Sequence, residues 1–508
     1  MKNIIKYLIL LVIGFSMVKC DLDVIPQDAL TSEQITTTSD GLSSLVNGLY
    51  AIFKEIDGNN CYIRQYYQLS DFASDDIVCA YKTEDDLINS FRYKDRAAEK
   101  SNINAFWEAS YKIIYGANVG ISMADLKGDD PSTNQLKGES YFLRAFATHN
   151  LVRLFAKPYN QTNKNEPGVI IRNEKADNMP KARATLEDSY NYIISSLKMA
   201  ESLMSEEMPA DRANDNHKYA SIYSVWAMLS RVYLYKQEYD SCIIYSDKLI
   251  ESGAFSLETP ESYPDFFANA KTSAEAIWLI PFNLIDDQLN GSVASMIFNG
   301  NNCWAEEGAS ASFMEDMQSG VSSDIDQRWS YIVTTDPIIK NGITMYYISK
   351  FSGQDGSSTL SSPVMFRLAE IYLNRAEAYA NLGDVPSAVA DLNELLANRI
   401  MVPEGDDIDN YLYHDAAIST GEIVDVVLHE RRIELAFEGH RIYDLLRTGT
   451  NIVRNYWGFH LDSYNGVPGG SEPGMDAGGV LFQTTDPWVI YPIPSSEIST
   501  NKLCVQNQ

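Results

Sequence analysis

The densest pattern of acidic and basic side chains lies in residues 429–449, HERRIELAFEGHRIYDLLRTG. Two of its carboxylates, Glu434 and Glu438, are four residues apart and could act as the general acid and base of glycoside hydrolysis. Such a pair must flank a sugar from opposite walls of a cleft, about 5–9.5 Å apart. On one helix they would share a face with arginines that keep both ionised. The pattern therefore favours a structural charge network, whose members are Arg431, Arg432, Glu434, Glu438, Arg441, Asp444 and Arg447.

The same segment also contains an incomplete metal motif. His429-Glu430 resembles the start of a zinc-protease helix, but Ile433 stands where that helix requires its second histidine. His440 and Asp444, one helical turn apart, could share a metal, although membership of the charge network explains both residues as well. We expect no metal here.

Other catalytic and cofactor motifs are lacking as well. Asp71, Asp75 and Asp76 could bind calcium, but they lack the loop glycine and the terminal glutamate of an EF-hand, and helix N-capping explains them equally. The sequence contains no Gly-x-Ser-x-Gly elbow, no P-loop and no Gly-x-Gly-x-x-Gly after a strand. It therefore predicts no catalytic residue and no cofactor, and leaves a structural calcium open.

Aromatic residues in polar loops are the remaining candidates for chemistry. The chain has 31 tyrosines and 19 phenylalanines. A sugar-binding site needs a ring to cover the apolar face of the sugar and planar polar groups to pair with its hydroxyls. Aromatic residues on the predicted helices are expected to be core. The candidate ligand-binding residues lie in two loops and are Trp304, Asn301, Asn302, Tyr81, Phe91 and Tyr93, with packing as the alternative role of each ring.

These loops must be positioned by helices, and residues 366–399 form the clearest helix–turn–helix. Apolar residues recur there at three- and four-residue steps. Gly383 should end the first helix, Asp384 should cap the second, and Pro386 falls in the first turn, where it costs little. Small Ala376 and Ala388 would let the two helices close up as in a tetratricopeptide-type repeat. An ordinary helical hairpin is the alternative.

Weaker copies of this unit can be found along the chain. Arg231, Tyr235, Asp240 and Asp247 have the mutual spacings of Arg375, Tyr379, Asp384 and Asp391, which makes residues 222–236 and 239–252 a second hairpin. Residues 40–54 with 104–126, and 135–156 with 184–204, are expected to form two more. Helix is expected again at 421–447, and strands at 277–282 and 345–351. The polar segment 61–102 has no period that predicts a stable element.

The sequence thus predicts a mainly α fold of four tetratricopeptide-like helical hairpins with an irregular, loop-rich second half. Residues 20–508 would form one domain, with helical repeats at about 40–252 and 364–447, an irregular insertion at about 253–362 and a C-terminal strap at about 448–508. The formal net charge of −29 argues against a nucleic-acid partner, because phosphates require a basic surface.

The first 19 residues predict an export signal. Lys2 and Lys6 precede an apolar run, residues 8–18, that is too short to span a bilayer. The run ends at Cys20, as in a bacterial lipoprotein signal in which this cysteine is acylated, although Lys19 departs from the usual small residue. Simple secretion is the alternative. The other five cysteines have neither zinc nor disulfide-framework spacing, and one bridge, Cys61 to Cys79, is expected at most.

Four blocks, taken together, resemble the SusD (RagB/SusD) family of nutrient-uptake outer-membrane lipoproteins. They are CDLDVIP with ALT at residues 20–31, GESYFLRAFATHNLVRLFAKPYN at 138–160, the charged block at 429–449, and WVIYPIPSSEISTNKLCVQNQ at 488–508. Ala156 replaces the usual glycine of the second block. The resemblance extends over the whole mature chain.

The resemblance implies a lipid-anchored protein at the outer face of the outer membrane. It would sit as a lid on a SusC-like TonB-dependent barrel transporter, bind oligosaccharides and deliver them inward, without catalysis. Two alternatives stay open: the bound cargo could be a peptide, or, from a different functional class, the protein could be a secreted glycan-cleaving hydrolase.

Overall fold

The structure is a computed structural model, and it describes residues 40–56, 60–79, 90–91, 97–174, 177, 179–213, 217–340, 343–454 and 480–507. Residues 1–39, which include the predicted signal and Cys20, lie outside these ranges, as do Tyr81 and Tyr93. Within the ranges, no helix is long and apolar enough to cross a membrane.

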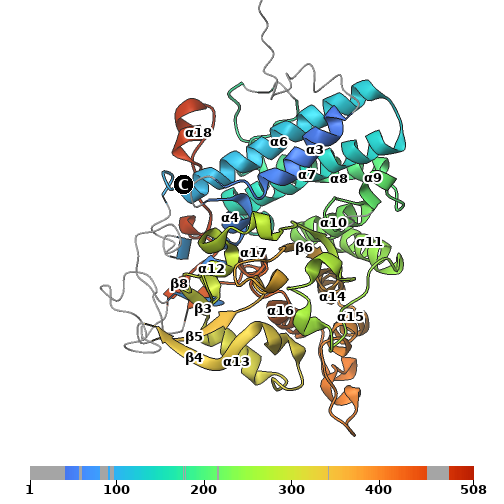
Figure 1. Cartoon of the computed structure of the whole chain (residues 1–508), viewed down its shortest axis with the longest axis vertical. Helices are drawn as coiled ribbons and strands as arrows, with labels where there is room; N and C mark the ends of the chain where they lie inside the picture. Colours follow the sequence, from blue (N-terminus) through green and yellow to red (C-terminus); the bar gives the residue numbers. More distant parts are fainter. Residues whose placement is uncertain are drawn as a thin grey trace, which may run out of the picture.

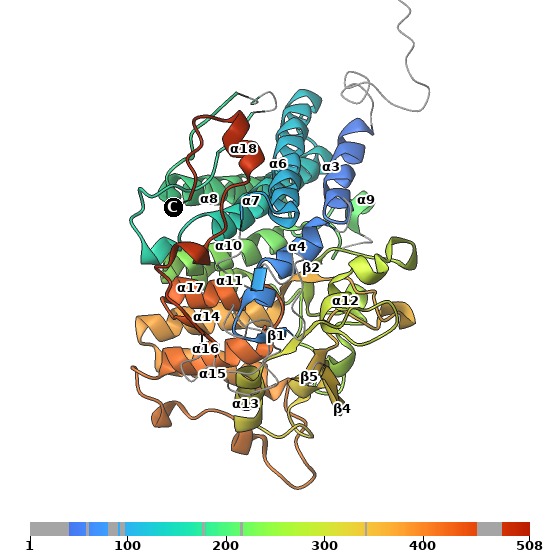
Figure 2. The same ribbon diagram turned by 90° about the vertical axis from the view of Figure 1, so that its left-hand side faces the viewer.

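Eight helices pair as four antiparallel hairpins that lie side by side down the molecule (Figures 1 and 2). Neighbouring hairpins touch through α6 with α7, α8 with α10, and α11 with α14. The mainly helical fold is therefore confirmed, with the predicted helix pairs. These are α3 (Gly41–Ile52) with α6 (Ser101–Lys127), α7 (Pro131–Phe155) with α8 (Leu186–Leu203), α10 (Ile222–Lys236) with α11 (Tyr239–Glu251), and α14 (Leu368–Leu382) with α15 (Val385–Ala397).

Local capping explains where these helices begin and end. Gly383 ends α14 in the left-handed conformation, at φ 81°, and the Asp384 carboxylate accepts from the Ser387 backbone N–H at 3.2 Å. At α7, the Asp130 carboxylate accepts from Thr133 N–H at 3.1 Å, ahead of Pro131 in the first turn. Both caps act within one turn; the sequence predicted the Asp384 cap, but it placed the start of α7 at residue 135, four residues late.

The matched positions of the two best repeats make different contacts. Arg375 donates to Asp391 of its own hairpin at 2.9 Å and to Asp247 of the neighbouring hairpin at 2.7 Å. Arg231, at the equivalent position, instead donates to Glu370 at 2.6 Å. Both arginines therefore join one hairpin to another, although the Arg231 contact does not use the matched aspartates.

The remaining described residues form short helices and three small antiparallel sheets. The sheets have strand orders β1-β3-β5-β4, β2-β6 and β7-β8. Their strands are β1 (Ile77–Cys79), β2 (Ala276–Leu279), β3 (Glu307–Ala309), β4 (Ile332–Lys340), β5 (Ile343–Ile348), β6 (Val364–Arg367), β7 (Ile452–Arg454) and β8 (Val480–Phe482). The short helices include α9 (Ala210–Ala213), α12 (Val293–Ile297), α13 (Ala311–Ser319), α16 (Ile423–Glu434), α17 (Arg441–Thr448) and α18 (Ser495–Thr500).

The expectation that segment 61–102 lacks stable elements is wrong for its first part. Helix α4 (Tyr62–Gln68), the 3-10 turn η1 (Asp71–Ala73) and β1 follow one another there, and nearly all of their side chains are buried. An element buried on every side shows no amphipathic period, and the partners of its polar residues lie far away in the chain. The sequence pattern therefore gave no indication of these three elements.

The single helix expected at 421–447 is interrupted. The chain leaves the helix between α16 and α17, where Phe437 has φ 68° and Gly439 has φ 85°. A Cβ on residue 439 would lie 2.4 Å from the Tyr66 ring of α4, so this close approach requires glycine. After the break, Arg441 of α17 pairs with Asp75, which follows η1, whereas Asp444 accepts from Arg431 of α16.

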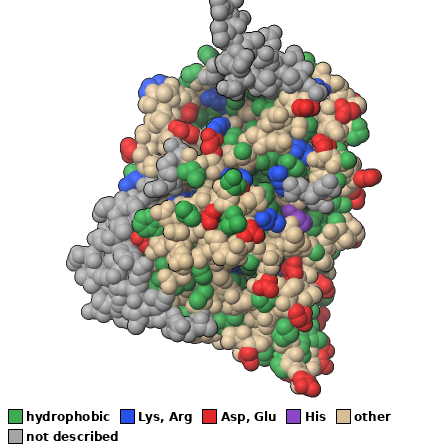
Figure 3. All heavy atoms as spheres, in the orientation of Figure 1, with side chains coloured by type: hydrophobic (Ala, Val, Ile, Leu, Met, Phe, Trp, Pro, Cys, Tyr) green, Lys and Arg blue, Asp and Glu red, His purple; other side chains and the backbone are tan. Residues whose placement is uncertain are grey.

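A large apolar core joins the first three hairpins and one side of α14 to the irregular half, and a second, smaller core lies between α14, α15 and α16. At the centre of the large core, Trp278 of β2 packs edge-on against Phe142 and Phe146 of α7, with ring centroids 5.0 and 4.9 Å apart. The loops of the second half are therefore held by the same core as the helices. Figure 3 shows acidic side chains spread over one face of the molecule and at its lower tip.

Candidate functional site

The two carboxylates considered as a hydrolase pair lie in a buried ion network. Arg367 donates from Nε to Glu438 at 2.8 Å, and Arg399 donates from Nη2 to Glu434 at 2.9 Å. Burial alone would raise the pKa of Glu434, but Arg399 and Arg367 outweigh it and hold that pKa well below its usual value. Two buried carboxylates whose pKa values are held low by arginines suit a structural role, as predicted.

Other members of the network find partners on distant segments. Arg432 donates to Asp76 at 2.8 Å, and Arg441 donates to Asp75 at 2.8 Å, so α16 and α17 are both tied to the segment after η1. Asp71 accepts from the Gly439 backbone N–H at 2.7 Å. The helix-capping interpretation of these three aspartates is therefore wrong. Within the ranges that the structure describes, no group of three or more His, Cys, Asp or Glu side chains could hold a metal ion.

His440 and Asp444 do not form a shared pair. The Asp444 carboxylate accepts from Arg431 at 2.8 Å and from Arg447 at 2.9 Å. Burial, together with the charges of Arg231 and Arg431, lowers the pKa of His440 well below its usual value, so the ring is neutral.

The loop that carries Trp304 is held in a defined shape beside α12. The Trp304 indole is 50% exposed, and its Nε1 donates to the Asn290 carbonyl at 2.8 Å. Ala305 N–H donates to the Ser295 carbonyl of α12 at 2.8 Å, which anchors the end of the loop. Asn301 and Asn302 are exposed in the same loop. The structure thus brings three of the candidate residues together on an accessible surface.

Phe91 occupies a different environment. Its ring is fully buried, with the Arg454 guanidinium 3.8 Å from the ring centroid. Arg454 also donates to the Phe91 carbonyl at 2.6 Å. In this position Phe91 packs and presents no ring face to solvent.

The expected bridge between Cys61 and Cys79 is wrong, since neither cysteine forms a disulfide. Cys61 caps α4, accepting from Arg64 N–H at 3.4 Å, and burial raises the pKa of its thiol. Cys79 lies in β1, paired with Glu307 of β3. The two cysteines belong to separate buried elements and serve as packing residues.

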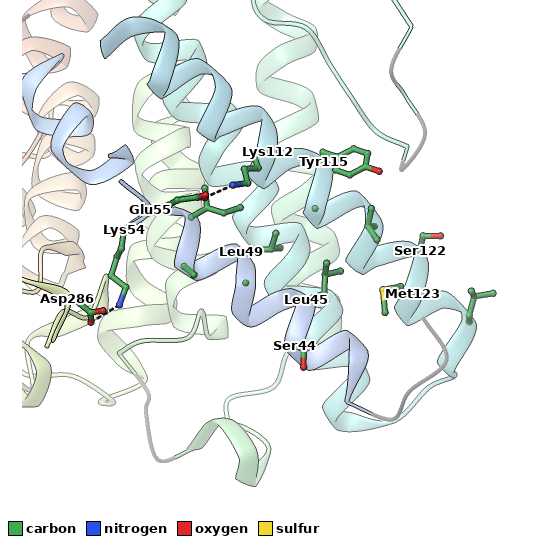
Figure 4. A pocket seen from close by; sticks show the side chains of 16 residues that line it. Ser44, Leu45, Leu49, Lys54, Glu55, Lys112, Tyr115, Ser122, Met123 and Asp286 are labelled. Atoms are coloured by element: carbon green, nitrogen blue, oxygen red, sulfur yellow. Dashed lines mark hydrogen bonds and ion pairs between the residues drawn. The ribbon is translucent and has the colours of Figure 1, made fainter. Parts of the chain in front are cut away.

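Among the described residues the structure adds cavities that the sequence did not indicate, and two of them lie on opposite sides of α6. The larger, about 1000 Å³, is an apolar groove between α3 and α6, lined by side chains such as Leu45, Leu49 and Met123 (Figure 4). Lys54 pairs with Asp286 at 3.0 Å at one end, and Lys112 pairs with Glu55. The smaller, about 320 Å³, lies between α6, the segment after α7 and α18.

Tyr115 of α6 lines both cavities and contradicts the expectation that aromatic residues on the repeat helices are core. Its side chain is 57% exposed, and in Figure 4 it extends from α6 away from α3. The helical period does place it next to core positions, so no sequence signal separated it from them.

Comparisons with known proteins agree with this architecture. A model of the SusD family matches residues 292–508, and a second SusD-like model, described as "Starch-binding associating with outer membrane", matches residues 22–234. SusD-like protein P38 of Formosa agariphila is 24% identical, over 88% of this chain and 92% of its own length. SusD-like protein P2 of the same organism is 24% identical, over 86% and 89%.

Solved structures show the same fold. A SusD superfamily protein from Bacteroides thetaiotaomicron superposes with a TM-score of 0.76 at 24% identity, covering 92% of this chain and 99% of that protein. A SusD-like carbohydrate binding protein from Bacteroides vulgatus superposes with a TM-score of 0.72 at 19% identity, covering 91% and 96%. The helical hairpins joined to a loop-rich half define a SusD-type architecture. The two family models together match both the N-terminal and the C-terminal parts of the sequence, at residues 22–234 and 292–508, so the chain belongs to the SusD/RagB family.

Proposed function

We propose that the protein is a cell-surface lipoprotein that binds oligosaccharides through a surface that includes Trp304. One observation carries this proposal: a half-exposed indole whose orientation is set by the hydrogen bond to Asn290, with two exposed amides beside it. The ring can cover the apolar face of a sugar while Asn301 and Asn302 pair with its hydroxyls. Because the loop is already ordered, little freedom is lost on binding.

The chemistry of relatives supports the same ligand class. One family model is described as starch-binding, and the relative from B. vulgatus is described as carbohydrate-binding. A peptide cargo has no comparable support in the described residues. We propose further that the protein binds without cleaving its ligand, because the carboxylates Glu434 and Glu438 are engaged by arginines in the core.

The proposal includes a partner protein and a cellular location. Acylation of Cys20 would anchor the chain to the outer membrane, with the binding surface outside the cell. A SusC-like TonB-dependent transporter would then receive the captured glycan, since a lid held over a barrel mouth keeps released ligand at a high local concentration. Co-purification with a large barrel protein in mild detergent is the expected result, and its failure in cells that express both would contradict the partner.

The Trp304→Ala variant tests the site. Loss of a stacking ring should cost about 1–3 kcal/mol of binding free energy, with each 1.4 kcal/mol a tenfold change in affinity. The melting temperature should barely change, because the ring is half exposed. Trp488→Ala, which removes a tryptophan that is 43% exposed elsewhere, is the matched control and should bind normally.

A glycan and peptide array, probed with the purified mature protein, supplies the ligand for that titration and decides between the two cargo classes. A Trp304→Ala protein that melts several degrees lower yet binds with unchanged affinity would show that the indole only packs. Incubation with the same glycans should release no new reducing ends. Turnover that scales with the amount of protein would favour the hydrolase instead.

A further inference from the structure

The smaller cavity beside α6 has the composition of a second binding site. Its volume, about 320 Å³, is at the lower end of the range of small-molecule sites. Side chains from three parts of the chain converge on it, including Trp107, Tyr111 and Tyr115 of α6, Arg172 of the segment after α7, and Glu497 of α18. In Figures 1 and 2, α18 lies beside the start of α6.

One face of α6 forms the aromatic wall. Tyr111 and Tyr115 are four residues apart, and Asn118 follows three residues later, so these side chains lie along one stripe. Tyr111 is fixed, because its hydroxyl donates to the Ile170 carbonyl at 3.0 Å and accepts from Ile170 N–H at 3.2 Å. Trp107 packs against it with ring centroids 4.9 Å apart. Tyr115, at the rim, leaves an exposed ring for a ligand.

The polar groups of the cavity are also held in place. The Arg172 guanidinium donates to the carbonyls of Asp177 at 2.8 Å and Met179 at 2.7 Å. Asn118 donates to the Arg172 carbonyl and accepts from Arg144, both at 2.9 Å. Planar donors and acceptors that are already oriented lose little entropy when a ligand binds.

The charge of the lining selects among ligands. The lining carries four carboxylates, those of Glu108, Glu174, Asp177 and Glu497, and one guanidinium, that of Arg172, which pairs with Asp177 at 3.3 Å. Carboxylates accept readily from sugar hydroxyls, whereas an acidic group on the ligand would be repelled. The aromatic wall and the fixed planar groups match an uncharged sugar ring.

We propose that this cavity is a second carbohydrate site, which binds one neutral sugar unit against Tyr115, separately from the Trp304 surface. The ligand class rests on the proposed function, but the site does not share a residue with the Trp304 loop. A chain with two sites could hold a branched or long glycan at two points, which raises the overall affinity without any new contact.

The test uses 5-fluorotryptophan protein and ¹⁹F NMR, because Trp107 lines this cavity and Trp304 marks the other surface. The seven tryptophan signals are assigned by single Trp→Phe substitutions. The probes are the neutral methyl glycosides of glucose, galactose and N-acetylglucosamine, with methyl glucuronide as the acidic counterpart. Neutral glycosides at millimolar concentration should shift the Trp107 signal, and the glucuronide should not.

Variants separate the two sites. Tyr115→Ala should weaken the Trp107 response about tenfold, which corresponds to about 1.4 kcal/mol, while Tyr115→Phe, which keeps the ring, should retain it. Trp304→Ala should leave the Trp107 response unchanged. A shift at Trp304 with none at Trp107 would overturn the second site and leave the proposed function standing. A Trp107 response that survives Tyr115→Ala, disappears with Trp304→Ala, or is equally strong for the glucuronide would also overturn it.

Discussion

The buried carboxylate of Glu434 should be the most sensitive charged position in the protein core. It lies between two arginines, accepting from Arg399 Nη2 at 2.9 Å and bridging to Arg367, and all three side chains are almost completely buried. Glu434→Gln keeps the shape but removes the negative charge, which leaves two guanidinium groups without full compensation. Breaking a buried ion pair in this way typically costs about 3–5 kcal/mol.

Urea unfolding of the mature protein measures this cost. The midpoint should fall markedly, with an unchanged slope if unfolding stays two-state. Lys112→Ala is the control, because Lys112 and its partner Glu55 are each 56% exposed and such surface pairs contribute about 0–1 kcal/mol. If Glu434→Gln lowered the free energy of unfolding by less than about 1 kcal/mol, the charge of Glu434 would not stabilise the fold through the network.

The pH dependence gives a second check of the same carboxylate. Burial raises the pKa of Glu434, but Arg399 and Arg367 lower it by more. The contribution of Glu434 to stability is therefore present above the unfolded pKa of about 4.3 and is lost as the pH falls further. The difference in the free energy of unfolding between the wild-type protein and Glu434→Gln should therefore become smaller at acidic pH. A difference that is constant from neutral pH into strong acid would show that it arises from packing rather than charge.

Three further predictions concern other parts of the chain. Burial raises the pKa of Asp71 to about 7, so its contribution to stability is present below pH ~4 and is lost as the pH rises through 7. The Asp71→Asn variant should therefore show a smaller fall in the free energy of unfolding between these two pH values. A pH profile identical to that of the wild-type protein would contradict this. Cys20→Ala should move the protein from membranes to the soluble fraction, unless another segment anchors it. Titration of the denatured, unreduced protein with a thiol reagent should detect all five cysteines from Cys61 to Cys504, whereas a count lower by two would restore the disulfide.

Part of the candidate site could be predicted from the sequence because a polar composition indicates a loop. Trp304, Asn301 and Asn302 stand in a polar stretch, and the structure places them on an accessible surface. Phe91 stands in a similarly polar stretch but is buried under Arg454, a residue 363 positions away. The type of a residue and its neighbours cannot report a partner at that separation.

The sequence by itself determined the eight helices of the four hairpins and some of their ends, because the 3.6-residue period and caps such as Asp384 act within a turn or two. It also indicated a charge network in the block at 429–449, but it did not predict which distant residues these side chains would pair with. Tertiary structure decided that, through the break at Gly439 and through pairs such as Arg432 with Asp76, separated by 356 residues. It also decided that Tyr115 stays exposed beside a cavity, since α18 and the segment after α7 approach that face of α6 only in the folded chain. Periodicity is a local property of the chain, whereas burial and ion pairing depend on what the rest of the fold brings near.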